Sequence, residues 1–186
     1  MWDPATGATV GRSVKVGWCG ALSPFFVRQR CLVAVASTNL LVWDPAAGSI
    51  VGDFMSGRTA NITAMCTFVV AGRTVLAGGC QEGDLRFWDV ATGQPLDFSL
   101  SGHEGPVKAV CAFHLEGRAL IASAGKDGTV RIWDVDNHRS AGPPLRGHRG
   151  AVNAICALEL ETRPLLASAG EDRTILLWEP AARCAP

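Results

Sequence analysis

A tryptophan recurs along this 186-residue chain at a nearly constant spacing, and this repeat restricts the possible folds more than any other feature. The recurring residues are Trp2, Trp43, Trp88, Trp133 and Trp178. Their successive intervals are 41, 45, 45 and 45 residues, and all but the last of them precede an aspartate. Gly-His pairs recur in step, each 30 residues before a tryptophan. A period of this length predicts an array of similar units stacked side by side.

The stretch from residue 102 to residue 146 shows what one unit contains. Residues 107–113 form an apolar run, and residues 119–124 are small and apolar, as in a strand that is packed on both faces. Asp127-Gly128 predicts a hairpin turn in which both residues tolerate a positive φ, and β-branched residues follow in 129–135. A polar stretch then leads to a last short strand around Leu145. One four-stranded sheet cannot hide both of its faces, so the units must stack around an axis.

The order of these features resembles the WD40-repeat β-propeller family, whose repeat runs from a Gly-His pair to a closing Trp-Asp. The last two units carry the resemblance best: GHEGPVKAVCAFHLEGRALIASAGKDGTVRIWDV and GHRGAVNAICALELETRPLLASAGEDRTILLWEP. It weakens in residues 57–89, and in residues 11–44 only the terminal Val-Trp-Asp and the strand pattern remain. The resemblance implies an all-β fold, a WD40-type β-propeller with four blades of four antiparallel strands in this chain.

The repeat boundaries predict one propeller unit over residues 1–186. An outer strand is expected in about residues 1–12, with blades in about 13–56, 57–101, 102–146 and 147–180. In WD propellers such an arrangement resembles the closure in which the first strand completes the last blade. Three architectures stay open: a four-bladed ring, a ring of eight blades made by two chains, or a piece of a longer chain. We favour a homodimer that exchanges strands at the junctions, because an open half-ring exposes two faces and an unpaired edge.

Two sets of residues suggest the triad of a hydrolase, but the resemblance implies a structural role for both. In WD40 proteins the matching positions form a buried hydrogen-bond network that includes the tryptophan of the third strand. Successive repeats carry identical copies, which favours architecture over catalysis, and the chain contains no GxSxG motif. We therefore expect no catalytic residue and no enzymatic activity. The two predicted networks are His103, Ser123, Asp127 and Trp133, and His148, Ser168, Asp172 and Trp178.

The network is incomplete in the first two units. In the second, the positions of the histidine, serine and aspartate hold Arg58, Gly78 and Glu82. In the first, no histidine is recognisable and Ser37 occupies the aspartate position. We therefore expect the backbone amides of these two units to exchange with solvent faster than those of residues 102–179.

Charge and cysteine content narrow the possible partners. The 17 basic and 17 acidic residues cancel, which gives no electrostatic reason for binding nucleic acid or an anionic membrane. No signal peptide and no apolar run long enough to span a bilayer is recognisable. The seven cysteines include no CxxC pair, and three of them recur inside apolar segments. We expect no metal site and no cofactor, and a reducing cytoplasmic location.

The resemblance implies that the chain is a non-catalytic scaffold that presents one face of the propeller to a protein or peptide. The expected surface combines the turn after the second strand with the start of the first, and its mixed chemistry suits a specific protein partner. The candidate residues are Thr63, Gln81, Lys108, Lys126, Asn153 and Glu171. One alternative is a sensor or regulatory propeller from a larger multidomain signalling protein of bacterial type. A hydrolase or a small-molecule binder at the central channel is less favoured.

Overall fold

The computed structural model describes residues 5–6, 14–27, 29–37, 39–54, 61–160 and 163–180. Within these ranges the chain is built from β-strands that form four antiparallel sheets, each from consecutive strands. The outer strand predicted in about residues 1–12 lies outside the described residues, apart from positions 5 and 6.

The four sheets follow one another along the sequence. Sheet one contains β1 (Ala21–Val27), β2 (Arg30–Ala36), β3 (Leu40–Asp44) and β4 (Ser49–Phe54). Sheet two contains β5 (Ile62–Val70), β6 (Arg73–Cys80), β7 (Asp84–Asp89) and β8 (Pro95–Ser101). Sheet three contains β9 (Val107–Leu115), β10 (Arg118–Gly125), β11 (Thr129–Asp134), β12 (Arg139–Ser140) and β13 (Leu145–Arg146). Sheet four contains β14 (Val152–Leu160), β15 (Arg163–Gly170) and β16 (Ile175–Trp178).

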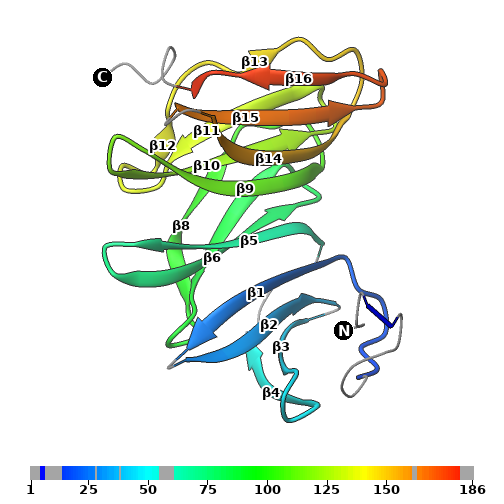
Figure 1. Ribbon diagram of the computed structural model, residues 1–186, viewed down its shortest axis with the longest axis vertical. Coiled ribbons are helices and arrows are strands. Elements are labelled where there is room, and N and C mark those ends of the chain that lie inside the picture. The colour runs from blue at the N-terminus through cyan, green and yellow to red at the C-terminus, as the bar shows by residue number, and fades with distance from the viewer. Residues whose placement is uncertain are drawn as a thin grey trace.

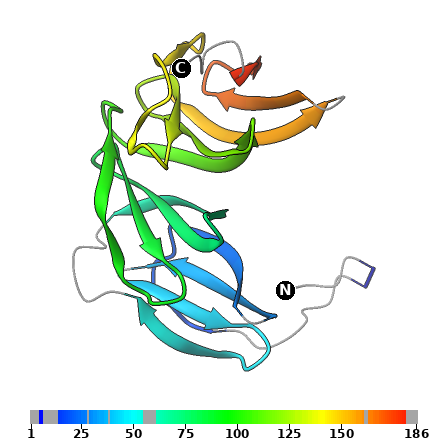
Figure 2. The same ribbon diagram turned by 90° about the vertical axis from the view of Figure 1, so that its left-hand side faces the viewer.

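The sheets stack face to face in chain order, with sheet one and sheet four at opposite ends of the stack (Figure 1). A view turned by 90° shows that the stack curves into an open arc (Figure 2). The first strand of each sheet lies beside the first strand of the next, so β1, β5, β9 and β14 follow the inside of the arc. The arc does not close on itself.

Three apolar clusters lie between neighbouring sheets and hold the arc together. One joins sheets one and two, a second joins sheets two and three, and a third joins sheets three and four. The second strands contribute small residues such as Ala34, Ala77 and Ala122, which are buried from both sides. Large side chains from the third strands fill the remaining space, and Phe87 and Trp133 are among the most deeply buried. The alternation of small and large residues lets adjacent sheets approach closely.

The strand pattern departs from four strands per sheet in two places. In sheet three the fourth strand is divided into β12 and β13, because Pro143 and Pro144 interrupt the segment between them. In sheet four the described residues form three strands in the order β14-β15-β16.

The turn at Asp127-Gly128 also differs from the expectation. Only Gly128 has a positive φ, of 76°, and its N–H donates to the carbonyl of Gly125 at 3.2 Å. Asp127 is not left-handed, and its carboxylate accepts a hydrogen bond from the N–H of Thr129, two residues later.

Within the described part of the chain, no helix is long and apolar enough to cross a membrane.

Candidate functional site

Four side chains of sheet three form a continuous hydrogen-bonded network at one end of the sheet. The indole N–H of Trp133 on β11 donates to the hydroxyl oxygen of Ser123 on β10 at 2.7 Å. Ser123 Oγ lies 2.7 Å from Nε2 of His103, and Nδ1 of the same ring lies 3.0 Å from both carboxylate oxygens of Asp127. The network thus ties the loop before β9 to the turn after β10.

Asp127 also organises the backbone around it. Its carboxylate accepts hydrogen bonds from the N–H of Glu104 at 3.1 Å and from the N–H of Thr129 at 3.0 Å. The Thr129 hydroxyl donates to the same carboxylate at 2.8 Å. One aspartate therefore fixes both the loop that leads into β9 and its own turn.

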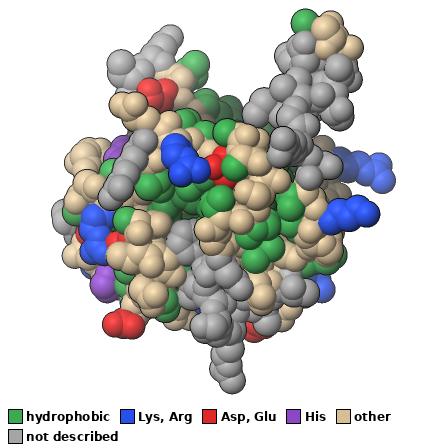
Figure 3. Space-filling model, turned by 90° about the horizontal axis from the view of Figure 1, so that it is seen from below, with side chains coloured by type: hydrophobic (Ala, Val, Ile, Leu, Met, Phe, Trp, Pro, Cys, Tyr) green, Lys and Arg blue, Asp and Glu red, His purple; other side chains and the backbone are tan. Residues whose placement is uncertain are grey.

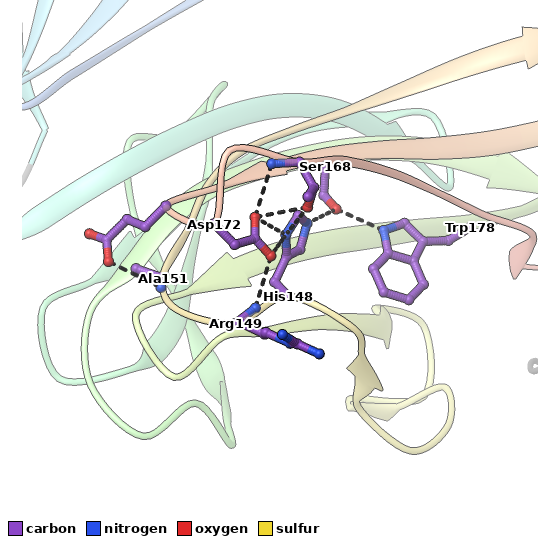
Figure 4. Close-up of polar contacts among 8 residues, drawn as sticks. His148, Arg149, Ala151, Ser168, Asp172 and Trp178 are labelled. Carbon is purple, nitrogen blue, oxygen red and sulfur yellow. Dashed lines mark hydrogen bonds and ion pairs between the residues drawn. The ribbon is translucent and has the colours of Figure 1, made fainter.

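Sheet four repeats the arrangement with equivalent distances (Figure 4). Trp178 Nε1 donates to Ser168 Oγ at 2.8 Å, His148 Nε2 lies 2.8 Å from Ser168 Oγ, and His148 Nδ1 lies 3.0 Å from Asp172. The N–H of Arg149 donates to Asp172 at 2.9 Å, as that of Glu104 does in sheet three. The structure thus brings together all eight residues that the sequence assigned to the two networks, as two separate sets of four.

The order of donors assigns a role to each group. The indole can only donate, so Ser123 accepts from Trp133 and directs its own O–H to Nε2 of His103. His103 then carries its proton on Nδ1 and donates it to Asp127. Although serine, histidine and aspartate are connected as in a hydrolase triad, Ser123 is 0% exposed and its oxygen already accepts the indole N–H. A substrate carbonyl cannot reach this hydroxyl in the folded chain.

Electrostatics keep the network in one protonation state. Burial lowers the pKa of His103 and outweighs the opposing effect of the neighbouring Asp127 carboxylate. Burial acts to raise the pKa of Asp127, but the hydrogen bonds from Glu104 and Thr129 prevail and lower it. The pKa of Asp172 is held well below its usual value, and the hydrogen bond from the N–H of Arg149 makes the largest contribution. At neutral pH, His103 is therefore neutral and both aspartates are charged.

The two halves of the predicted partner-binding surface lie together at this end of the sheets, which we call the turn end (residues 81–83, 126–128 and 171–174 with the starts of β5, β9 and β14). The N–H of Gln81 donates to the carbonyl of Asn61, that of Lys126 to Pro106, and that of Glu171 to Ala151, all at 2.8–2.9 Å. Each turn is thereby attached to the residues just before an inner strand. The exposed candidates are Gln81, Lys108, Lys126, Asn153 and Glu171.

Thr63 differs from the other candidates because its hydroxyl is used inside the fold. It donates to the carbonyl of Gly79 at 3.0 Å and also contacts the carbonyl of Val107 in the next sheet. Thr63 is half-buried, so it bridges sheets two and three and offers little to a partner.

In sheet two, Gly78 stands where sheet three has Ser123, and Trp88 lies against it. A Cβ at Gly78 would come within 2.8 Å of the Trp88 ring, and Trp88 Nε1 is buried without a hydrogen-bond partner among the described residues. Glu82 accepts a hydrogen bond from Asn61 at 3.2 Å, which replaces the missing aspartate contact in part. Arg58, at the predicted histidine position, lies outside the described residues.

Sheet one lacks the aspartate turn because its second hairpin is shorter. Trp43 pairs with Val33, ten residues earlier, whereas Trp133 pairs with Ile121, twelve residues earlier. Pairing therefore places Val35, not Val33, at the position of Ser123. Ser37, at the predicted aspartate position, donates its hydroxyl to the carbonyl of Val16 at 2.7 Å.

A second repeated contact was not anticipated from the sequence. Within the described residues, the aspartate that follows Trp43, Trp88 or Trp133 accepts hydrogen bonds from the backbone of its own turn, and Asp89 for example accepts from Ala91 at 2.8 Å. The same aspartate pairs with an arginine at the start of the second strand. The pairs are Arg30 with Asp44, Arg73 with Asp89, and Arg118 with Asp134. The 45-residue spacing of Arg73, Arg118 and Arg163 was the available signal.

One group of potential metal ligands occurs within the described residues. Donor atoms of Cys80, Glu82 and Asp84 lie within 4.8 Å of one another. Burial raises the pKa of the Cys80 thiol to about 12, so the thiolate that binds metals is disfavoured. Asp84 is already paired with Arg86 at 2.7 Å. The chemistry of these residues therefore fits a local ion pair better than a metal centre.

A cavity of about 380 Å³ opens between sheets two and three at the end opposite to the turn end. Val70, Leu96, Phe98 and His138 form part of its lining, and the Phe98 and His138 rings stack with centroids 3.7 Å apart. It contains none of the network residues.

Comparison with known proteins shows what this geometry is similar to. Residues 94–134 and 142–179 match the family model described as WD domain, G-beta repeat. No curated protein sequence gives a significant match. Among solved structures, the computationally designed Ika4 protein is similar, with 22% sequence identity and a TM-score of 0.65 over 91% of this chain and 95% of Ika4.

Two larger structures contain the same arrangement. The computationally designed Ika8 protein shares 24% identity with a TM-score of 0.66, over 91% of this chain and 48% of Ika8. The structure of the RRP9 WD40 repeats shares 21% identity with a TM-score of 0.69, over 89% of this chain and 49% of that one. The chain thus spans nearly all of Ika4 and about half of the two larger proteins. At these identities the likeness concerns the fold.

The two family-model matches coincide with the repeats that contain the complete networks, and the similar structures share the stacked-sheet arrangement. These findings confirm the resemblance inferred from the spacing of the tryptophans. Residues 94–134 and 142–179 are therefore WD40 repeats, and the described chain has a fold similar to that of WD40-repeat proteins.

Proposed function

We propose that this chain is a non-catalytic scaffold that binds a protein or peptide partner at the turn end of its sheets. WD40 repeats generally mediate protein–protein interactions. The observation that carries the proposal is the combination of exposed, chemically varied side chains with a rigid support. Lys126 and Glu171 are exposed, yet each belongs to a turn that an aspartate, a histidine and backbone hydrogen bonds hold in place.

Rigid support matters because it lowers the entropy lost on binding. A partner that meets a loop already fixed by Asp127 or Asp172 does not have to order that loop. The surface offers a cation at Lys126, an amide at Asn153 and a carboxylate at Glu171, three groups that suit a defined pattern of polar contacts. A uniform polyanion such as nucleic acid finds no continuous basic surface in this set.

Absence of catalysis is part of the proposal. Its support is the burial of Ser123 and Ser168, each of which accepts the N–H of a tryptophan. Treatment with a serine-reactive fluorophosphonate probe tests this part. Labelling that disappears in Ser123→Ala or Ser168→Ala while the chain stays folded would contradict it.

The binding surface is tested by charge reversal with matched controls. Peptides selected on the purified chain from a displayed random library should lose at least tenfold in affinity for Lys126→Glu or Glu171→Lys. Arg139→Glu and Glu116→Lys make the same changes at exposed positions on the opposite end and should bind as the unaltered chain does. Equal losses in all four variants, or none in the first two, would contradict a partner site at the turn end.

We also propose that two chains join into one closed ring of eight blades, so that the arc is half of a propeller. The open arc and the coverage of about half of Ika8 and of the RRP9 structure support this assembly. A molar mass near twice 19.6 kDa in light scattering is the expected result, and a stable mass of one chain would contradict it. The segment predicted to be exchanged between chains lies mostly outside the described residues.

A cytoplasmic location completes the proposal. All six cysteines within the described ranges are free thiols, in keeping with a reducing compartment.

A further inference from the structure

The outer face of sheet four is chemically a copy of a face that is buried elsewhere in the molecule. Sheet three packs against sheet four through residues that include Cys111, Leu115, Ala122, Ala124, Val130 and Ile132. The residues 45 positions later are Cys156, Leu160, Ala167, Ala169, Ile175 and Leu177. Val130 is 0% exposed and Ile132 5%, whereas Ile175 is 74% exposed and Leu177 63%. Sheet four therefore carries a complete blade-packing face with nothing upon it among the described residues.

Sheet one presents the opposite kind of face, which is exposed at Leu22 and Phe26. Its residues Phe25, Ala34 and Val42 pack on sheet two, so the neighbouring positions point outward. These include Leu22, Pro24, Phe26, Val33 and Trp43, none of them charged, and Phe26 is 67% exposed. Hydrophobic side chains gather over the end of the molecule that β1–β4 form (Figure 3). In sheet four the matching face, with Leu166 and Trp178, is the one that packs on sheet three.

Every junction inside the chain joins these two kinds of face. The outward face of sheet four corresponds to the face that each inner sheet turns toward the next sheet in the chain. The outward face of sheet one corresponds to the face, containing the tryptophan, that each later sheet turns toward the sheet before it. We infer that the outward face of sheet four packs directly on the outward face of sheet one from a second copy of the chain. This inference rests on the two-chain ring proposed above and specifies the joint. The joint is head to tail, and a two-fold axis makes it twice, so no bare apolar face remains.

The internal junctions also give the register of this joint. At the first, the Ser23 hydroxyl on β1 lies 3.4 Å from the Thr67 hydroxyl on β5, and Thr67 donates to the carbonyl of Pro24 at 2.7 Å. At the third, Cys111 on β9 and Ala157 on β14 pack into the same apolar cluster between sheets three and four.

Strand pairing makes the two contacts equivalent. In sheets one, two and four, one residue of the first strand pairs with the second-strand residue that in turn pairs with the tryptophan of the third strand. This first-strand residue is Pro24 in sheet one, Thr67 in sheet two and Ala157 in sheet four. The second-strand residues between them and the tryptophans are Val33, Leu76 and Leu166. The position before each of them is Ser23, Cys66 or Cys156. The same register applied to the joint places Cys156 of one chain against Pro24 of the other.

A disulfide trap tests the register. Pro24→Cys is made in a background in which Cys19, Cys31 and Cys184 are replaced by serine, and the chain is oxidised with copper phenanthroline. We expect a covalent dimer of twice 19.6 kDa on a non-reducing gel, which disappears when Cys156→Ser is added. Ala157→Cys in the same background calibrates the reach of the reaction, because the introduced thiol should form a disulfide with Cys111 inside one chain.

The Ala157→Cys variant shows whether the oxidation can join two thiols at this spacing, so the result for Pro24→Cys can be interpreted whether or not a dimer forms. If the Ala157→Cys variant forms its disulfide within one chain and the Pro24→Cys variant forms none between chains, the proposed joint is wrong. This holds whether the chain is a monomer, a dimer joined elsewhere, or half of a longer protein whose own repeats cover these faces.

A second experiment changes the bare face itself. Ile175→Arg with Leu177→Arg should reduce the molar mass from two chains to one, because burying two guanidinium groups without partners is unfavourable. Val69→Arg alters an exposed aliphatic residue on β5 in sheet two and should leave the dimer intact. Retention of the dimer in the double variant would overturn the joint.

The same double variant separates this joint from the partner site. Peptide binding at the turn end that survives in a monomer would leave the scaffold function standing while the ring is taken apart.

Discussion

At the scale of single residues, burial favours a structural role for groups that have the connectivity of a hydrolytic triad. Ser123, His103 and Asp127 are linked in the order of a hydrolytic triad, yet the hydroxyl accepts an indole N–H and has no access to solvent. The same three groups that would activate a nucleophile at a surface here satisfy one another inside the fold. Buried polar groups of this kind stabilise only when every member is paired, so each residue of the network matters to its neighbours.

Removing one member should therefore leave the others unpaired. His148→Ala should lower the free energy of unfolding by about 1–3 kcal/mol, because Ser168 and Asp172 lose a hydrogen-bond partner. Urea denaturation of the variant measures the loss, and His114→Ala, at an exposed position, is the control. An unchanged midpoint for His148→Ala would contradict the structural role of the network.

Protonation of His103 gives the network a dependence on pH. Because burial depresses the pKa of His103, the unfolded chain takes up a proton at about pH 6.5 that the folded chain resists. The stabilisation is complete above that pH and is lost progressively as the pH falls towards the lower pKa of the folded state. In His103→Gln the slope of unfolding free energy against pH should be smaller below pH 6.5, by at most about 1.4 kcal/mol per pH unit. Identical slopes in the two proteins would refute this.

Arg173 occupies a backbone conformation that suits glycine. Its φ is 64°, and Gly128 holds the matching position in sheet three with a φ of 76°. Arg173→Gly should raise the free energy of unfolding by about 0.5–1 kcal/mol, since a side chain in this region is strained. Gly128→Ala is the converse change and should be destabilising, because its Cβ would lie 2.9 Å from the carbonyl oxygen of Gly150. A lower melting temperature for Arg173→Gly would count against the strain.

At the scale of strands and sheets, the repeats differ in how many of their polar groups are satisfied. Sheets three and four carry complete networks, whereas Trp43 and Trp88 in sheets one and two have indole nitrogens without a partner among the described residues. Trp88 occupies the space above Gly78, so a serine introduced at position 78 would collide with the ring. The packing of Trp88 against Gly78 in sheet two therefore leaves no room for the serine that the network needs.

Hydrogen exchange should show this gradient along the chain. Backbone amides in β2, β3, β6 and β7 should exchange faster than the equivalent amides in β10, β11, β15 and β16, because fewer side-chain hydrogen bonds resist local opening. Mass spectrometry after deuterium labelling can resolve the four sheets. Equal protection of all sheets, or slower exchange in sheets one and two, would be the contrary result.

The sequence predicted most of the repeated architecture because period, glycine and tryptophan all point to the same unit. The resemblance to WD40 repeats also implied that His103, Ser123, Asp127 and Trp133 form one network, and the structure brings these four residues together. Prediction from the sequence failed where tertiary contacts decide. In sheet one a hairpin two residues shorter puts Val35 in the place of Ser123, a shift that the tryptophan spacing does not reveal. The hydroxyl of Thr63 bridges two sheets, which spacing alone does not reveal.

At the scale of the whole molecule, the arc carries unlike bare faces at its two ends. Burying them in a second copy removes large apolar side chains such as Phe26 and Ile175 from water, which favours association. A folded state that needs two chains gains stability with concentration. The melting temperature should therefore rise when the chain concentration increases from about 1 to 100 µM. Differential scanning fluorimetry checks this, and the Ile175→Arg, Leu177→Arg variant should lose the dependence.

A joint between unlike ends has no built-in limit on the number of members it adds. It stops growing only when the wedge angle between successive sheets brings the last end back to the first. The summed rotation of the four sheets therefore sets whether the product is a closed ring or an open fibre. Substitutions deep between sheets, such as enlarging Ala77 or Ala122, would change that angle without touching either end. An assembly whose angle no longer returns its last end to its first would extend into a filament.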